Sequence, residues 1–139
     1  MCNNNANNDS CRCIAEILSV INVLQQNACT SDTCLDTCDR KFLGCGTNTL
    51  NCNTRPVMLT LCNGTRLQMP TTKDDITEEN LSPVFRVEKV EGCCCTFRVL
   101  TPNGEEAENP YSATNSFFTV NLNCVCSLRC LSDTYVECI

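Results

Sequence analysis

The first regular pattern along the chain is helical. Between residues 13 and 26, apolar residues recur at intervals of three and four: Ile14, Ile17, Leu18, Ile21 and Leu24. This spacing puts the apolar side chains on one side of an α-helix. We therefore predict an amphipathic helix over residues 13–26 that packs one face against the rest of the domain. Residues 1–10 before it are rich in asparagine, and we expect a flexible arm there.

Alternating apolar and polar residues predict strands farther along. In RPVMLTLCNGTRLQM (55–69) the alternation runs into an Asn63-Gly64 pair, which is typical of a hairpin turn because both residues tolerate positive φ. The segment FTVNLNCVC (118–126) alternates in the same way. It predicts a strand with these residues on the core side: Phe118, Val120, Leu122, Cys124 and Cys126.

A second hairpin is predicted from PVFRVEKV (83–90) and CTFRVLTP (95–102). A two-residue turn at 91–92 would place Phe85 opposite Arg98. A three-residue loop at 91–93 instead pairs Phe85 with Val99 and Val87 with Phe97, which keeps one face apolar. We prefer the second register.

That register separates the three adjacent cysteines that follow Gly92. Cys93 falls in the turn, Cys94 points to the outer face, and Cys95 points to the core beside Phe97, because neighbouring side chains of a strand alternate between faces. The triplet is therefore not expected to form a single site.

The composition is unusual in its cysteine content, since 16 of the 139 residues are cysteine. This exceeds the roughly 8–10 % usage typical of disulfide scaffolds. Residues 27–55 are polar and rich in turn residues and cysteine, so we expect a loop held by covalent links. The start of the chain carries no pattern of a secretory signal, which predicts synthesis in a reducing compartment and later oxidation.

Charge and residue types exclude several functions. The net charge is −6 and no basic run exceeds Arg40-Lys41, so we expect neither nucleic acid nor membranes as partners, because phosphate binding needs clustered cations. The chain has no histidine, which removes the usual general base. We therefore expect that the protein is not an enzyme and binds no cofactor.

The cysteines leave several interpretations open. Zinc binding is the alternative function, although the chain has C-x-C at 11/13, 93/95 and 124/126 but no C-x-x-C. A secreted toxin or inhibitor is a weaker one. The core-facing Cys95, Cys124 and Cys126 are either buried thiols or internal disulfides. Cys2, Cys94 and Cys138 have few neighbours in their own chain and are best placed to reach another.

Several stretches together resemble a known family. They are NTRP (53–56), SPVFRVEKV (82–90), CTFRVL (95–100) and FTVNLNCVCSLRCL (118–131), preceded by the apolar helix and a C-x₃-C at 34/38. In this order they are similar to the cysteine-rich spore coat and exosporium proteins CotY, CotZ and ExsY of endospore-forming bacteria. The resemblance covers about residues 11–131.

The resemblance implies a structural protein that self-assembles into an ordered layer or appendage at the spore surface, cross-linked by disulfides. Its partners would be copies of itself and other coat or exosporium proteins. It would be made in the mother-cell cytoplasm without a signal peptide, and oxidise when that cell lyses. No catalytic or metal site is implied.

From these patterns we expect a mainly β fold, a small antiparallel β-sandwich or jelly-roll-like domain over residues 11–139 with one N-terminal helix. Candidates for intermolecular disulfides, on position alone, are Cys2, Cys11, Cys94 and Cys138. Candidates for intramolecular disulfides or buried thiols are Cys34, Cys38, Cys95, Cys124, Cys126 and Cys130.

Overall fold

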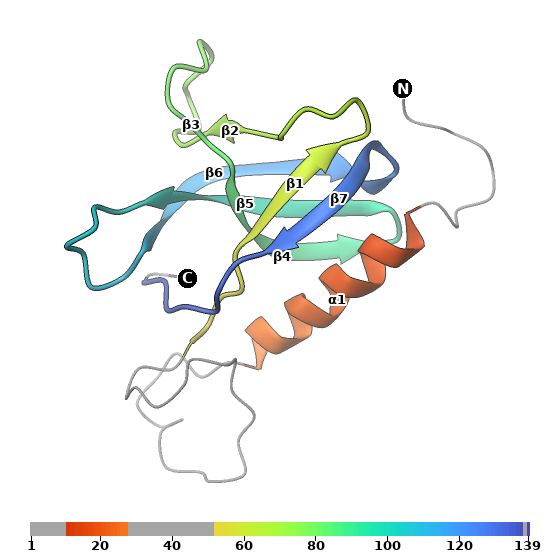
Figure 1. The fold of residues 1–139 in the computed structure, drawn as a ribbon, viewed down its shortest axis with the longest axis horizontal. Coiled ribbons are helices and arrows are strands. Elements are labelled where there is room, and N and C mark those ends of the chain that lie inside the picture. The colour runs from red at the N-terminus through yellow and green to blue at the C-terminus, as the bar shows by residue number, and fades with distance from the viewer. Residues whose placement is uncertain (1–10, 28–51, 138) are drawn as a thin grey trace, which may run out of the picture.

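The computed structural model describes residues 11–27, 52–137 and 139 (Figure 1). It confirms a mainly β, antiparallel domain with an N-terminal helix. In order, its elements are α1 (Arg12–Gln26), β1 (Val57–Leu61), β2 (Met69–Pro70), β3 (Leu81–Ser82), β4 (Val84–Glu91), β5 (Cys94–Pro102), β6 (Tyr111–Asn121), the 3₁₀ turn η3 (Leu122–Cys124) and β7 (Val125–Cys130).

Five strands form the main sheet, in the order β6-β5-β4-β1-β7, and β2 pairs separately with β3. β1 joins β4 at only one register pair, Val57 with Phe85. Beyond that pair, β1 and β7 run obliquely to β4, β5 and β6 (Figure 1). Buried residues of β1, β4, β5, β7 and α1 nevertheless belong to one hydrophobic core.

The predicted helix is confirmed, and it begins one residue earlier than expected, at Arg12. Leu18 and Ile21 are buried against the sheet, and the Gln25 side chain donates to the backbone oxygen of Val87 (2.9 Å). Ile17, which the pattern placed on the packed side, is 43 % exposed. The apolar surface of α1 is therefore wider than the face it buries.

The preferred register of β4 and β5 is confirmed, since Phe85 pairs with Val99 and Val87 with Phe97. Phe85 and Phe97 pack with Phe118 of β6, with ring centroids 4.7–6.0 Å apart. The predicted three-residue loop is wrong. The register shifts between Val87 and Lys89, so that Glu91 pairs with Cys94 and the turn is only Gly92-Cys93, with Gly92 at φ +59°.

The Asn63-Gly64 turn after β1 is also present, and Gly64 has φ +88°. The returning half of this predicted hairpin is short. It contacts β1 through an isolated bridge between Thr60 and Arg66 and through a Leu67 N–H bond to Leu59.

A buried polar cluster, which we call the polar clamp, holds the C-terminal tail; it consists of Asn53, Thr54, Arg55, Asp133 and Val136. The Asn53 amide donates to the Val136 carbonyl and accepts from the Val136 N–H, both at 2.9 Å. Arg55 donates to both carboxylate oxygens of Asp133, at 2.6 and 2.8 Å. The tail thereby covers the second face of the sheet, where Val136 packs with Val84 and Leu100.

Arg86 of β4 connects the polar clamp to the outer face. Its side chain is buried and donates to Thr54 Oγ1 (3.0 Å), to the Asn53 carbonyl and to both oxygens of Glu88. Glu88 also accepts from Arg98 of β5 (3.2 Å). A buried guanidinium requires such partners, because desolvation disfavours its charge and lowers its pKa while Glu88 raises it.

Candidate functional site

Two disulfides whose cysteines both lie in the described residues are found at one end of the sheet. Cys11, just before α1, bonds Cys93 in the β4–β5 turn, and Cys62 after β1 bonds Cys126 of β7. Their Cα atoms are 5.8 and 4.8 Å apart across sequence separations of 82 and 64. Each bond therefore joins segments that only the fold brings together. We call this region the disulfide end.

The cysteine triplet has three different environments, and two of them follow the predicted alternation. Cys95 is fully buried and Cys94 is exposed, and both are free thiols. Burial raises the pKa of Cys95 to about 12, so this thiol stays protonated and unreactive at neutral pH. Cys93 lies in the turn as expected and is disulfide-bonded.

The predicted core-facing position of Cys126 is wrong, because the strand does not continue through residues 122–124, and Cys124 is half-buried. Asn123 N–H donates to the Asn121 side chain (3.0 Å) and the chain turns through η3. The alternation restarts one position later, so Val125 is buried and Cys126 is exposed. Cys126 is still in an intramolecular disulfide, and Cys124 is disulfide-bonded.

Two further cysteines differ from their expected environment. Cys11, a candidate for an intermolecular link, is buried and bonded within the chain. Cys130, a candidate for an internal disulfide or a buried thiol, is an exposed free thiol. It ends β7, an edge strand whose one partner among the described strands is β1. Desolvation raises its pKa, while Arg55 lowers it and Asp133 raises it.

Three exposed free thiols thus lie on three elements of the described chain: Cys13 on α1, Cys94 on β5 and Cys130 on β7. Sequence reasoning named Cys94 but missed Cys13. The signal for Cys13 was its place in a second helical row, with Ile17 and Val20, one residue ahead of the buried row. Ile17, Val20 and Val23 are 43–60 % exposed along this side of the helix.

The remaining predicted site residues, Cys2, Cys34, Cys38 and Cys138, and the predicted arm at 1–10 lie outside the described residues. Cys52, just before the polar clamp, is buried and disulfide-bonded.

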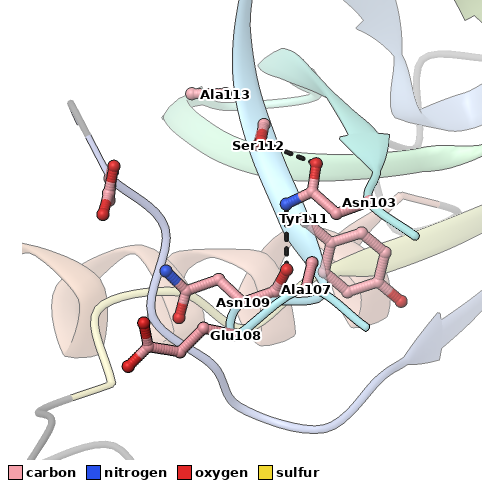
Figure 2. Close-up of a pocket in the computed structure, with 8 residues that line it drawn as sticks. Asn103, Ala107, Glu108, Asn109, Tyr111, Ser112 and Ala113 are labelled. Atoms are coloured by element: carbon pink, nitrogen blue, oxygen red, sulfur yellow. Dashed lines mark hydrogen bonds between the residues drawn. The ribbon is translucent and has the colours of Figure 1, made fainter. Parts of the chain in front are cut away.

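A polar hollow of about 380 Å³ lies between the β5–β6 loop and the C-terminal tail (Figure 2). Asn103 closes the loop: its amide donates to the Asn109 carbonyl (2.9 Å) and accepts from the Ser112 hydroxyl (2.8 Å), as the dashed lines in Figure 2 show. Glu108 and Glu137 also line the hollow. Ser112 donates to a neutral amide, and these hydrogen bonds stabilise the loop.

Within the described residues, no group of three or more potential metal ligands gathers around one point. In the same part of the chain, no helix has the length and apolar character needed to span a membrane.

A family model described as Spore coat protein Z matches residues 1–112 of the chain. That span includes the helix, the polar-clamp residues 53–55 and strands β1 to β5. No curated protein and no solved structure matches the chain.

Proposed function

Because this chain belongs to the spore coat protein Z family, its role is structural, and we propose that its copies self-assemble into an ordered layer or appendage locked by intermolecular disulfides. This assembly would lie at the spore surface, in the coat or exosporium.

One observation supports the proposal: some cysteines form disulfides within the chain, whereas others are exposed free thiols that could bond a second copy. Cys11, Cys93, Cys62 and Cys126 are consumed by internal bonds. Cys13, Cys94 and Cys130 are free and exposed. A new disulfide between two copies requires two thiols to lose two protons and two electrons to an external oxidant such as dioxygen. Exposed thiols can meet that requirement, whereas the buried Cys95 cannot.

The positions of the available thiols favour extended assembly. They lie on α1, on β5 and on the edge strand β7, so one copy can bond neighbours in more than one direction. Contacts that do not close on themselves generate sheets or filaments. Other coat proteins with accessible thiols could be joined by the same chemistry. Oxidation would follow lysis of the mother cell, which removes the reducing cytosol.

The test is electrophoresis of oxidised protein with and without reductant. We expect a ladder of multimers without reductant that collapses to monomer with it. The triple variant Cys13→Ser, Cys94→Ser, Cys130→Ser should lose most of the ladder. Cys95→Ala is the matched control and should keep it, because Cys95 is buried.

Monomer alone under oxidising conditions would contradict the proposal. A ladder that persists unchanged in the triple variant would show that other cysteines make the links, and Cys2→Ser and Cys138→Ser then test the two remaining predicted linkers.

A further inference from the structure

The outer side of β6 is a strand edge with which no other strand of the described residues pairs. β6 is the first strand of the main sheet, and in the described part of the chain its only partner is β5. Exposed edges present unpaired N–H and C=O groups that can pair with another strand, so proteins usually blunt them with lysine, proline or a bulge.

The first half of β6 is irregular and lies near another loop. Its register with β5 shifts between Arg98 and Leu100, and residues 113–115 face the loop 71–74 across a shallow hollow. The C-terminal half, residues 117–121, pairs regularly with β5 from Arg98 back to Cys94. Of the two halves, this one pairs regularly with β5, and no strand of the described residues pairs with its outer edge.

The ladder shows which backbone groups face outward. Leu122 N–H donates to the Cys93 carbonyl (2.7 Å), which makes these two residues a hydrogen-bonded pair. Such pairs alternate with pairs that exchange no hydrogen bonds in an antiparallel ladder. Phe117, Thr119 and Asn121 therefore occupy the second kind of pair, and their N–H and C=O groups point away from β5.

A side-chain contact agrees with this alternation. Thr119 Oγ1 and Thr96 Oγ1 are hydrogen-bonded at 2.9 Å, as expected where cross-strand side chains lie closest, in pairs without backbone hydrogen bonds. The outward groups of Thr119 thus have no partner on β5.

The chemistry of this edge fits a second copy of the same chain. Two copies of net charge −6 repel each other, and contact costs least where neither surface is charged. No charged residue occurs from residue 109 to 128, although 19 % of the chain is charged. The C-terminal half of β6 is also rich in aromatic and β-branched residues, which favour strands.

We propose that residues 117–121 of β6 pair with the same residues of a second copy, in an antiparallel contact centred on Thr119. This deepens the proposed function and rests on its self-association. Phe118 of one copy then faces Val120 of the other on the core side, and the half-buried side chains cover each other. About six backbone hydrogen bonds can form, two for each outward residue on one strand.

The edge contact and the exposed thiols would have separate roles in assembly. A two-fold contact closes at the dimer. Cys13 lies on α1 and Cys130 on β7, at the opposite edge of the sheet from β6, while Cys94 pairs with Asn121 beside the contact. Edge pairing would bring copies together without oxidation, and disulfides would then extend and lock the assembly.

The test uses full-length protein alkylated with iodoacetamide under non-denaturing conditions, so that accessible thiols cannot cross-link. Sedimentation velocity should still show a monomer–dimer equilibrium. Thr119→Lys places like charges opposite each other, and Thr119→Pro removes an outward N–H without removing a bond to β5. Each should weaken dimerisation about tenfold or more.

Two controls separate edge pairing from damage to the fold. Thr119→Val keeps the strand and loses only the hydroxyl, so it should dimerise like the parent. Ser127→Lys adds the same charge to exposed β7 and should also dimerise. Hydrogen exchange of residues 117–121 should slow with rising protein concentration.

A fully monomeric alkylated protein, or Thr119 variants that are folded by circular dichroism and dimerise like the parent, would overturn the edge contact. Either result leaves the disulfide ladder of the unalkylated protein as an independent measure of the proposed function.

Discussion

The two ends of the sheet are closed by different chemistry. At the disulfide end, Cys11–Cys93 and Cys62–Cys126 tie the helix start and β7 to the strand turns. At the other end, the polar clamp ties the C-terminal tail to residues 53–55 by hydrogen bonds and one bidentate ion pair. Both join segments far apart in sequence. The two disulfides require oxidation and the bonds of the polar clamp do not, although Cys52, next to the polar clamp, is itself disulfide-bonded.

The difference matters for the synthesis that we propose in a reducing cytosol, where disulfides are rare. The polar clamp can hold the tail against the sheet before any thiol is oxidised, and its strength comes from buried partners. The disulfides then restrict the unfolded chain. We therefore expect the polar clamp to hold the tail in reduced protein and the disulfides to add stability on oxidation.

The largest expected effect is the loss of one disulfide. The double variant Cys62→Ala, Cys126→Ala opens a closure of 64 residues, and chain entropy predicts a loss of about 4 kcal/mol in unfolding free energy. Urea unfolding under oxidising conditions measures it. Cys95→Ala is the control, because it should retain the stabilisation that the parent gains on oxidation. A double variant as stable as the parent would show that this bond constrains little.

Asn53→Ala should have the next largest effect. Asn53 is only 2 % exposed, and its loss leaves both backbone groups of Val136 without their partner. We expect a loss of about 3 kcal/mol, because each buried group left unpaired costs about 1–3 kcal/mol. The same urea experiment measures it, and the loss should be equal with and without reductant.

Asn115→Ala on exposed β6 is the matched control for that change and should shift stability by less than about 0.5 kcal/mol. If the Asn53 variant is destabilised only after oxidation, the two ends are coupled and the contrast between them fails.

The smallest expected effect is a difference in reactivity between two adjacent thiols, Cys94 and Cys95. At pH 8 iodoacetamide should label Cys94, which is exposed, and leave Cys95 unlabelled, because burial raises its pKa to about 12. Peptide mass spectrometry after quenching distinguishes them. The raised pKa also predicts how stability changes with pH. The contribution of Cys95 to stability is fully present below its unfolded pKa near 9 and is lost as pH rises toward 12.

Cys95→Ala should therefore flatten the alkaline fall in stability. Equal labelling of Cys94 and Cys95 in folded protein would mean that the two faces of β5 are not distinct.

Local patterns predicted the parts of the fold that local physics controls. The helix and the pairing of Phe85 with Val99 followed from the side on which apolar residues recur. The turn was misplaced because a one-residue shift beside Glu88 leaves no mark in the alternation. Cys126 was misplaced because an asparagine side chain bends the strand at η3.

No local pattern in the sequence predicted the polar clamp or the pairing of the disulfides. Residues 53–55 of the polar clamp stood out only as part of the family motif NTRP, since their partners lie about 80 residues away. Cys11 was expected to link chains because its partner, Cys93, is adjacent only after α1 packs on the sheet. Among the described residues, chemistry that depends on long-range contact was therefore the least predictable.

The Cys11–Cys93 bond also sets how tension would travel through an assembly. Cys13 is two residues from Cys11, and Cys94 is the residue after Cys93. A pull between neighbours attached at Cys13 and Cys94 would run through these few residues and one disulfide, and would bypass the sheet. Stretching the assembly along this path would load covalent bonds and leave the hydrogen-bonded strands unstrained.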